Sequence, residues 1–477
     1  MSALADLRQD PDRARAAAAW GLLLTSHALA VVFSRGYMQM DEHFQVLEFL
    51  QWKFGAIASA DMPWELPTRM RPWLHVFLFY PLEWFSRHML ELSPFLRTTL
   101  HRGCVATLAL IAIRCLTRRH PEQLGMFATL FFLPLFDVRL SAEVIGGYLF
   151  AIGYALDEAL DPAAPRATRR LLGLGFLFGI AVVIRLMVAA MFAGLVLFHL
   201  RRREWKRSLL LLPGVVAAQA LGVLCDRIGY GELTWVPWNY FEQNILRGNA
   251  VHFGSAPYYA YASMLLEQSG YIPGAVLLAA LFFHWLRRPL DRVTYVTLPF
   301  VVLHACIAHK ELRYLFPIAP FVPALLRTLW EAIARFWIAR PLARVFVALN
   351  LVLMLPASLH DANAYIGLYA ALFEHAPAEP SVLHYKNSTD PLRPWSLRPS
   401  YYVDQLALSS QPLPRERAHW HGLVMVEFLD DYRELRRDRR CELLASRYPR
   451  ALLDAWPNWL PERHAPWLKL WSLWQCP

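Results

Sequence analysis

The sequence predicts an all-α membrane protein that crosses the bilayer many times and carries a small C-terminal domain outside it. Of the 477 residues, 56% are hydrophobic and only 18% are charged, whereas soluble domains are about 45–50% apolar and about 25% charged. The apolar residues fall in blocks of roughly 15–29 residues, separated by connectors rich in Arg or in Trp and Pro, and about 20 apolar residues span a bilayer.

We expect about 9–12 crossings, with span ends defined to within several residues, and the longest apolar segment is 171–199. Arg185 interrupts that segment, which favours two short helices there. The candidate spans are 16–34, 73–90, 98–116, 123–137, 142–160, 171–199, 208–224, 272–286, 293–308, 314–330 and 345–359. The first could also be a cleaved signal peptide, but its apolar run continues through Val31–Phe33, which favours a signal anchor.

Basic residues beside the spans predict which side each connector faces. Cytoplasmic connectors are enriched in Lys and Arg, and the strongest basic cluster is Arg201–Arg207. The net charge of +10 is therefore typical of the positive-inside rule rather than of nucleic-acid binding. The domain prediction is a transmembrane core at 1–359 with outside loops, and an outside C-terminal region at 360–477. The outside loops are 35–72, 225–271 and 309–313.

Two topologies stay open around 73–90. If this segment spans, Arg118 and Arg119 lie outside, against the positive-inside rule. If it lies at the interface, they lie inside, and 171–199 crosses twice. Cys441 and Cys476 lie in the outside tail, where a disulfide is permitted. The sequence contains no Walker loop, no GxGxxG after a strand and no HExxH, so ATP-driven transport and soluble-cofactor redox chemistry lose support.

The first outside loop combines adjacent acids, aromatic residues and two arginines. Carboxylates bind sugar hydroxyls, and the planar guanidinium of Arg binds phosphate with two parallel hydrogen bonds, so the loop is a candidate sugar-phosphate surface. A solvated cap with snorkelling Trp and Arg is the alternative. The candidate residues are Asp41, Glu42, His43, Gln45, Glu48, Arg69 and Arg71.

The second loop offers the amides of Asn239 and Asn244 and the phenol of Tyr258. Binding groups concentrate on loops, whereas an interfacial aromatic belt explains the tyrosine equally well.

The turn 309–313 places four ionisable residues between two apolar runs: His309, Lys310, Glu311 and Arg313. A charged residue at membrane depth costs about 2.5–3.5 kcal/mol, so a hydrated turn outside the membrane is one interpretation. The other is a phosphodiester site, because residues three apart share one helical face.

Two of these segments resemble the signatures of glycosyltransferase family 22, the mannosyltransferases of GPI anchors and of lipid-linked N-glycan precursors. "HKELRYLFPIAP" is similar to the family's "HKEERFL-P", and "MDEHFQVLEF" to its "HPDE-(H/Y)-F-Q-x-x-E". Looser matches follow in family order over about 38–320: Arg69–His75, "RLSAE" at 139–143, "VVIRLMVA" around Arg185, and "WNYFEQNILRGNAVHFGSAPYYAY". The leading His-Pro is Gln39-Met40 here, a departure that bears on the acceptor more than on the chemistry.

The resemblance implies a GT-C fold and inverting transfer of mannose from a polyprenyl-phosphate donor to a glycan or glycolipid acceptor. Asp41 would be the general base and Glu42 its orienting partner or alternate. The groups expected to stabilise the leaving lipid phosphate are His309, Lys310, Arg313, Arg69 and Arg71. The groups expected to contact substrate are His43, Gln45, Glu48, Asn239, Asn244, Tyr258, Glu311 and Arg185. No metal or other cofactor is expected, although Asp41 and Glu42 leave a divalent ion open.

Two other functions stay open: a GT-C enzyme that uses another lipid-phosphate sugar or a protein acceptor, and a lipid or solute transporter. Transporters often show internal repeats, and the sequence shows none. The Ala/Arg-rich composition is typical of a GC-rich bacterial genome, which favours an inner-membrane protein with a periplasmic site; a eukaryotic source would imply the endoplasmic reticulum membrane. The expected partners are the donor, the acceptor and membrane lipids, without nucleic acid.

Overall fold

The computed structural model divides the chain into two compact units. The structure describes residues 11–161, 163–375, 380–386, 389–404, 406–413, 422–438, 440–455 and 470–477. The first unit comprises Met1–Ser34, Glu65–Pro81 and Leu100–Leu359, and the second Arg35–Trp64, Leu82–Thr99 and His360–Pro477. The division predicted after residue 359 coincides with one of these boundaries.

The second unit also takes in two segments that we had placed in the core, namely Arg35–Trp64 and Leu82–Thr99. Arg35 donates two hydrogen bonds to Asp361, Nε to Oδ1 at 2.8 Å and Nη2 to Oδ2 at 2.9 Å. This paired interaction raises the pKa of Arg35. The start of the first outside loop is therefore tied to the start of the C-terminal region, a contact between residues far apart in the sequence.

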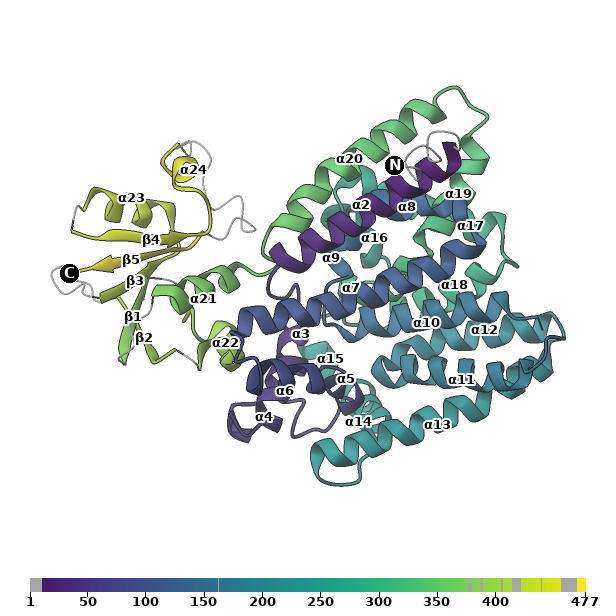
Figure 1. Ribbon diagram of the computed structural model, residues 1–477, viewed down its shortest axis with the longest axis horizontal. Helices are drawn as coiled ribbons and strands as arrows, with labels where there is room; N and C mark the ends of the chain where they lie inside the picture. Colours follow the sequence, from purple (N-terminus) through teal and green to yellow (C-terminus); the bar gives the residue numbers. More distant parts are fainter. Residues whose placement is uncertain are drawn as a thin grey trace. The chain divides into compact units, whose positions relative to one another are not determined.

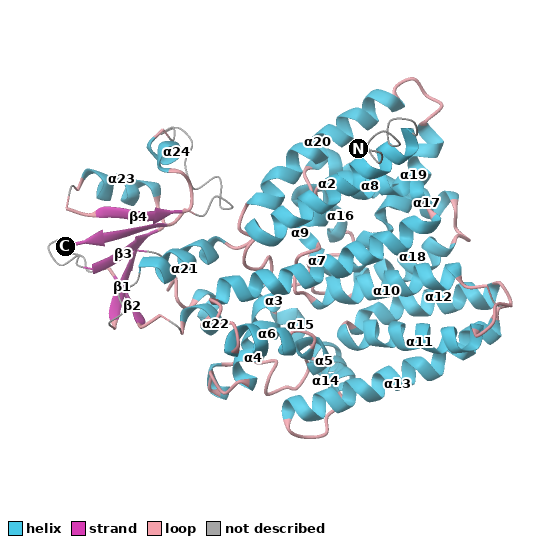
Figure 2. Cartoon of the chain, in the orientation of Figure 1, coloured by secondary structure: helices cyan, strands magenta, loops and turns pink. Residues whose placement is uncertain are grey.

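Helices make up the described part of the first unit, as Figures 1 and 2 show. Two further helices, α6 (Tyr80–His88) and α7 (Pro94–Arg119), contribute to both units. The elements of the first unit are α2 (Pro11–Phe33), α5 (Trp73–Phe77), η3 (Pro121–Gln123), α8 (Leu124–Thr129), α9 (Phe132–Phe136), α10 (Ala142–Ala159), α11 (Ala167–Ile184), η4 (Leu186–Val188), α12 (Ala189–Arg201), α13 (Trp205–Tyr230), α14 (Val236–Phe241), η5 (Glu242–Leu246), α15 (Asn249–His252), α16 (Ala260–Gln268), α17 (Tyr271–Arg287), α18 (Arg292–Cys306), η6 (Leu312–Phe321), α19 (Val322–Ile333) and α20 (Ala339–Leu359).

Five helical segments among the described residues are long and apolar enough to cross a membrane: Pro11–Phe33, Pro94–Arg119, Ala167–Ile184, Trp205–Tyr230 and Ala339–His375. Shorter apolar helices cover Leu186–Arg201, Tyr271–Arg287 and Arg292–Cys306. The predicted multi-pass helical fold is confirmed.

Three predicted spans are not continuous α-helices. The 73–90 segment forms α5 and α6, which are too short to cross a bilayer. The 123–137 segment forms η3, α8 and α9. The 314–330 segment begins in the 3₁₀ helix η6 and continues as α19. Pro317 and Pro320 of η6 lack the N–H that an α-helix requires. The predicted break at Arg185 is present, since α11 ends at Ile184 and η4 begins at Leu186. These bounds agree with the topology in which 73–90 does not span.

Close helix packing in the first unit depends on glycine. Helix α11 packs along α13 and α10, and α12 packs along α18 (Figure 1). A Cβ atom at Gly175 of α11 would collide with the backbone of Leu211 in α13, and one at Gly214 of α13 would collide with the backbone of Leu172. Small residues at such contacts let membrane helices approach closely, where dispersion replaces the missing hydrophobic drive.

The second unit contains all of the strands that the structure describes (Figure 2), which the sequence analysis had not predicted. They form one sheet in the order β2-β1-β3-β5-β4, in which β1 is parallel to β2 and β3, and β5 is antiparallel to β3 and β4. The elements are α3 (Met40–Glu42), η1 (His43–Leu47), α4 (Glu48–Lys53), η2 (Ser59–Asp61), α21 (Ala364–His375), β1 (Ser381–Lys386), η7 (Pro394–Ser396), α22 (Ser400–Val403), β2 (Leu408–Pro412), β3 (Gly422–Val426), α23 (Leu429–Arg437), β4 (Glu442–Ser446), α24 (Arg450–Asp454) and β5 (Ser472–Cys476).

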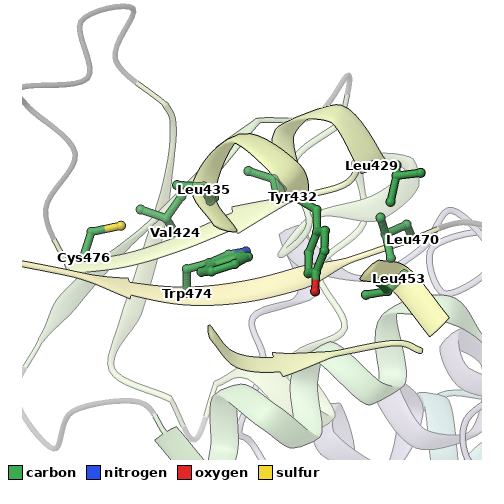
Figure 3. Close-up of a cluster of buried hydrophobic side chains, with 9 residues drawn as sticks. Val424, Leu429, Tyr432, Leu435, Leu453, Leu470, Trp474 and Cys476 are labelled. Carbon is green, nitrogen blue, oxygen red and sulfur yellow. The ribbon is translucent and has the colours of Figure 1, made fainter. Parts of the chain in front are cut away.

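A buried apolar cluster joins this sheet to α23 and α24 (Figure 3). Val424 of β3 and Trp474 of β5 are cross-strand partners, and the Trp474 ring lies 5.6 Å from that of Tyr432 on α23. The permitted disulfide is present, because Cys441 at the start of β4 bonds to Cys476 at the end of β5. The C-terminal region is thus a folded domain with its own core.

Candidate active site

The charged turn of the first unit is fastened to the second outside loop by hydrogen bonds to backbone atoms. The imidazole of His309 contacts the carbonyl oxygen of Gly254 through Nδ1 at 3.2 Å. Lys310 Nζ donates to the carbonyl oxygen of Ala256 at 2.9 Å, and the Ala256 N–H donates to the carbonyl of Ala308 at 2.9 Å. Two motif segments that are more than 50 residues apart therefore form one local structure.

Glu311 is the centre of this turn. Its carboxylate accepts two hydrogen bonds from Arg313, from Nε at 2.7 Å and Nη2 at 3.0 Å, and one from the hydroxyl of Tyr314 at 3.1 Å. His309 Nε2 lies 2.9 Å from the same carboxylate. Both ring nitrogens of His309 thus face oxygen atoms of the protein. Glu311 thus holds the side chains of the turn in place, and its expected contact with substrate stays a prediction.

A second carboxylate, Glu143, lies beside the turn and was not among the predicted site residues. The Ser141 side chain accepts a hydrogen bond from the N–H of Val144 and so caps α10, which puts Glu143 in the first helical turn. Arg185 occupies the extended break after α11, and its Nη2 lies 3.1 Å from Glu143 Oε1. Arg313 Nη1 lies 3.7 Å from the same oxygen.

This arrangement leaves a surplus of buried positive charge. The cations Arg185, Lys310 and Arg313 are 8%, 6% and 6% exposed, while Glu143 is 2% exposed. Among the described residues of this cluster, the two carboxylates Glu143 and Glu311 stand against these three cations. An uncompensated charge in such a place is costly, so paired or ligand-bound states are preferred. The cluster is therefore suited to receive an anion.

Arg69 and Arg71, also in the first unit, each carry a carboxylate partner. Arg69 pairs with Glu232 and is half-exposed, whereas Arg71 Nη2 lies 3.3 Å from Glu65 Oε1 and is mostly buried. The buried imidazole of His75 is within electrostatic range of Arg71, Arg185 and Glu143. This interaction joins Arg71 to the cluster of cations around Glu143.

The residues predicted in the second loop have different surroundings. Asn239 Nδ2 donates to the carbonyl oxygen of Arg69 at 3.0 Å, so it supports that arginine's backbone. Asn244 Nδ2 donates to the carbonyl of Tyr240, four residues earlier. Tyr258 is 75% exposed, as expected of a residue at an interface or an open surface.

Tyr261 is a candidate that sequence reasoning missed. Its side chain is buried, and its hydroxyl has no hydrogen-bond partner among the described residues. It interacts electrostatically with Arg185 and Glu311, and burial raises the pKa of its phenol. Nothing in the sequence separates Tyr261 from its neighbours Tyr258 and Tyr259, whereas Glu143 could have been found as an acid in an otherwise apolar helix.

The carboxylate pair of the first loop belongs to the second unit. Asp41 and Glu42 lie in the short helix α3, where Asp41 is half-buried and Glu42 only 4% exposed. The chain then widens into the π-helix η1, in which Gln45 is 8% exposed. Single π-helical turns are frequently found at functional sites, and this one directly follows the acid pair.

His43 and Glu48 are packed inside the second unit. His43 Nε2 lies 2.6 Å from Glu48 Oε1, which also accepts the backbone N–H of Tyr401 at 3.1 Å. The His43 ring stacks on Tyr37 and on Tyr402, with centroids 5.0 Å and 5.4 Å apart. Burial raises the pKa of Tyr37. These contacts occupy both side chains, which were predicted to contact substrate, and connect the acid-bearing loop to the segment around residue 401.

Among the described residues, no three His, Cys, Asp or Glu side chains gather as a metal site would require.

Residues 19–401 match the profile of the Alg9-like mannosyltransferase family. The chain belongs to that family. The resemblance inferred from the motifs is confirmed, and the match extends over both the turn at 309–313 and the acid pair at 41–42.

Curated relatives of known name share shorter stretches with this chain. GPI mannosyltransferase 3 of Eremothecium gossypii is 32% identical over 141 residues, which are 26% of this chain and 23% of that protein. GPI alpha-1,2-mannosyltransferase 3 of Homo sapiens is 28% identical over 30% of this chain and 26% of its own length. The probable Dol-P-Man:Man(7)GlcNAc(2)-PP-Dol alpha-1,6-mannosyltransferase of Schizosaccharomyces pombe is 27% identical over 30% of this chain and 27% of its own. The alignments thus span about a quarter of each relative.

Among solved structures, ArnT from Cupriavidus metallidurans bound to undecaprenyl phosphate has a TM-score of 0.49 at 12% identity, covering 96% of this chain and 97% of that one.

Proposed function

We propose that this protein is an inverting mannosyltransferase that transfers mannose from a polyprenyl-phosphate donor to a glycan or glycolipid acceptor. The observation that carries the proposal is the buried surplus of positive charge around Arg185, Lys310 and Arg313, in a chain that belongs to a mannosyltransferase family. A lipid-linked phosphate brings the matching negative charge to the membrane. The S. pombe relative is named as a probable Dol-P-Man-dependent mannosyltransferase, which supports this donor class.

The reaction assigns separate tasks to the acids and the cations. Asp41 accepts the proton of the acceptor hydroxyl, and Glu42 orients it or replaces it as base. The hydroxyl oxygen forms a bond to the anomeric carbon from the face opposite the phosphate, and the bond from that carbon to the phosphate oxygen breaks. The products are the glycoside and polyprenyl phosphate, whose phosphate has gained one negative charge.

The cations act on the negative charge that develops on the leaving phosphate. His309, Lys310 and Arg313 are the proposed partners of the leaving phosphate, with Arg71 and Arg69 as further candidates. Preorganised donors stabilise a transition state without the reorganisation that water would need. Here the carboxylates of Glu311 and Glu143 provide that order, since they fix the guanidinium of Arg313 from two sides. No resident metal or other cofactor is needed for this step.

The proposed site lies on the outer face of the membrane. The positive-inside rule supports this orientation, since the most basic connector, Arg201–Arg207, lies at the other end of α12 from Arg185. We propose the bacterial inner membrane with a periplasmic site, or the endoplasmic reticulum membrane with a lumenal one. A different lipid-phosphate sugar, or a protein acceptor, is the second candidate, because Gln39-Met40 replaces the family's His-Pro.

The decisive experiment is transfer in membranes that carry this protein. Radiolabelled polyprenyl-phosphate mannose is supplied with native lipid and glycan extracts, and wild type is compared with Asp41→Ala at equal expression. Asp61→Ala is the matched control, because Asp61 is an exposed acid of the same segment. We expect a loss of at least about 10²-fold in Asp41→Ala and none in Asp61→Ala.

Each other result has a definite meaning. Product that survives in Asp41→Ala moves the base to Glu42 or elsewhere. Product that forms only with another polyprenyl-phosphate sugar replaces mannose as the donor sugar. Absence of transfer from every such donor, with folded wild-type protein, contradicts the proposed activity.

A further inference from the structure

A second charged cluster lies at the opposite ends of the helices that carry the candidate site. Helix α10 holds Glu143 in its first turn and Asp157 in its last, and fourteen residues of α-helix extend about 21 Å. Arg201 ends α12, and Arg292 begins α18, which packs along α12 (Figure 1). This second cluster is therefore separate from the cations around Arg185, and it belongs entirely to the first unit.

Two adjoining hollows open at this end of the first unit, and we call them together the Asp157 cavity. They hold about 310 and 400 Å³, enough for a phosphate group with several waters. Glu158, Asp291 and Arg292 line both hollows, so the two hollows adjoin. The cavity thus combines polar walls with free volume, unlike the interior of an ordinary ion-pair network, which is close-packed.

Asp157 itself is saturated by cations. It is fully buried and lies 2.9 Å from Arg207 Nε and 3.0 Å from His199 Nε2, and Arg292 Nη2 also bonds to it. Two guanidinium groups and an imidazole therefore share one carboxylate. Arg207 also reaches a second acid, Glu204, at 3.2 Å, whereas Asp157 is the acid with which Arg292 forms an ion pair among the described residues.

The other carboxylates of the cavity also have partners. Asp291 accepts the N–H of Val293 and caps α18, and Glu158 lies 3.4 Å from His120. By contrast, one hydrogen-bond donor remains without a partner. Within the part of the chain that the structure describes, Arg292 Nε is buried without a hydrogen-bond partner, although Arg292 lines both hollows.

The charge of the cavity and its connector favours an anion. Among the residues that line the two hollows, the carboxylates are Asp157, Glu158, Glu204 and Asp291, and the guanidinium groups are those of Arg201, Arg202, Arg207, Arg288, Arg292 and Arg327. Six cations thus stand against four acids. Arg201 forms no ion pair with any described residue and is exposed at the rim. The positive-inside rule places this end at the cytoplasmic face, where anionic lipid headgroups attract Lys and Arg.

We propose that the Asp157 cavity is a second phosphate-binding site, occupied by the phosphodiester headgroup of an anionic membrane lipid at the cytoplasmic face. Arg292 is the buried donor at its base, and Arg201 and Arg202 are the exposed donors at its rim. Guanidinium groups bind phosphate oxygens through paired N–H donors. The site does not depend on the transfer reaction, and free phosphate is the other source of the same chemistry.

The test uses the full-length protein, reconstituted in phosphatidylcholine vesicles with and without phosphatidylglycerol, with bound phosphatidylglycerol measured by native mass spectrometry. A third arm adds inorganic phosphate to protein in neutral lipid. Because Arg292→Gln disturbs the buried contacts of Asp157, the principal variant replaces the exposed pair, Arg201→Gln with Arg202→Gln. The control is Arg169→Gln with Arg170→Gln, exposed arginines of the first turn of α11 that do not line the cavity.

We expect the rim variant to bind phosphatidylglycerol about tenfold more weakly than wild type, and the control to bind as wild type does. Specific binding of inorganic phosphate that the rim variant also loses supports the site and assigns it to a soluble source. Equal loss in the rim variant and the control means attraction to the basic surface in general, and overturns the proposal. So does a wild-type protein that retains neither phosphatidylglycerol nor phosphate.

Discussion

At the scale of residues, the charged side chains around Glu143 and Glu311 are held in place by other side chains of the protein. Arg313 donates to Glu311 at 2.7 Å and lies 3.7 Å from Glu143, while Arg185 lies over the ring of Tyr314 at 5.3 Å. A guanidinium fixed in this way loses little freedom when an anion arrives. The carboxylates thus fix the positions of the guanidinium groups, and the excess of positive charge attracts an anion.

Two roles for Glu48 can be tested at this scale: support of the buried His43 ring, or contact with substrate. We predict that Glu48→Ala lowers the free energy of unfolding by about 3 kcal/mol, because it removes the acceptor of the buried His43 ring and of the Tyr401 N–H. Thermal unfolding followed by tryptophan fluorescence measures this, with Glu442→Ala as an exposed control in the same unit. The conservative Glu48→Gln keeps one acceptor oxygen and should recover part of the stability.

If Glu48 instead contacts substrate, the pattern of effects reverses. Glu48→Ala would then unfold at the wild-type temperature and show a higher KM for donor or acceptor. That result would return Glu48 to the binding surface that the sequence suggested, and would leave the buried contacts without a measurable role in stability.

At the scale of elements, the position of η6 against α10 determines where Arg313 lies. Gly146 and Gly147 follow Glu143 by one turn, and a Cβ atom at Gly147 would lie 2.7 Å from the Cα of Pro317 in η6. Backbone cannot move aside as a side-chain tip does, so a larger residue must push the two elements apart.

We therefore predict that Gly147→Ala reduces the transfer rate at saturating donor by about 10²-fold, because a displacement near 1 Å at a reacting group has effects of that size. Gly173→Ala is the matched control, since no atom lies within 4 Å of its Cβ position in α11. Initial rates are measured with both variants at equal expression. A Gly147→Ala enzyme as fast as wild type would mean that the contact between α10 and η6 does not position the cations.

At the scale of the whole molecule, the chain forms two units, and segments of one unit alternate with segments of the other along the sequence. The last strand, β5, completes the sheet of the second unit, because it pairs with both β3 and β4. Cys476 at the end of this strand bonds to Cys441, 35 residues earlier. A crosslink of that span restricts the unfolded chain, which stabilises the fold by about 4 kcal/mol in the chain-entropy account.

The prediction at this scale is that a reducing agent or Cys441→Ser lowers the unfolding temperature of the second unit by several degrees. Limited proteolysis with detection of the C-terminal fragment reports the second unit separately. Cys104→Ser is the control, because Cys104 is an exposed free cysteine. Reductant should leave the Cys441→Ser protein unchanged; an equal effect on both proteins would show that the bond contributes nothing.

Much of the helical architecture was predictable from the sequence, because apolar length alone decides which segments can cross a bilayer. The break at Arg185 was visible as a charge inside an apolar run, and the segments at 38–48 and 309–320 carried the family resemblance. The split of 73–90 and 123–137 into short helices was not visible, since hydropathy does not distinguish a continuous helix from two interrupted ones. The strands were missed because the C-terminal region has no long periodic pattern.

The sequence by itself determined the class of protein, the family, the order of the spans and the identity of the charged segments, because each of these depends on residues that are neighbours in the chain. Only the tertiary structure decided which charges meet. Glu143 reaches Arg185 and Arg313, Tyr401 reaches Glu48, and Arg292 reaches Asp157, across separations of 42 to 353 residues. Pairing at such range follows from helix packing and from the cost of leaving a buried charge alone, and neither has a signature in the local sequence.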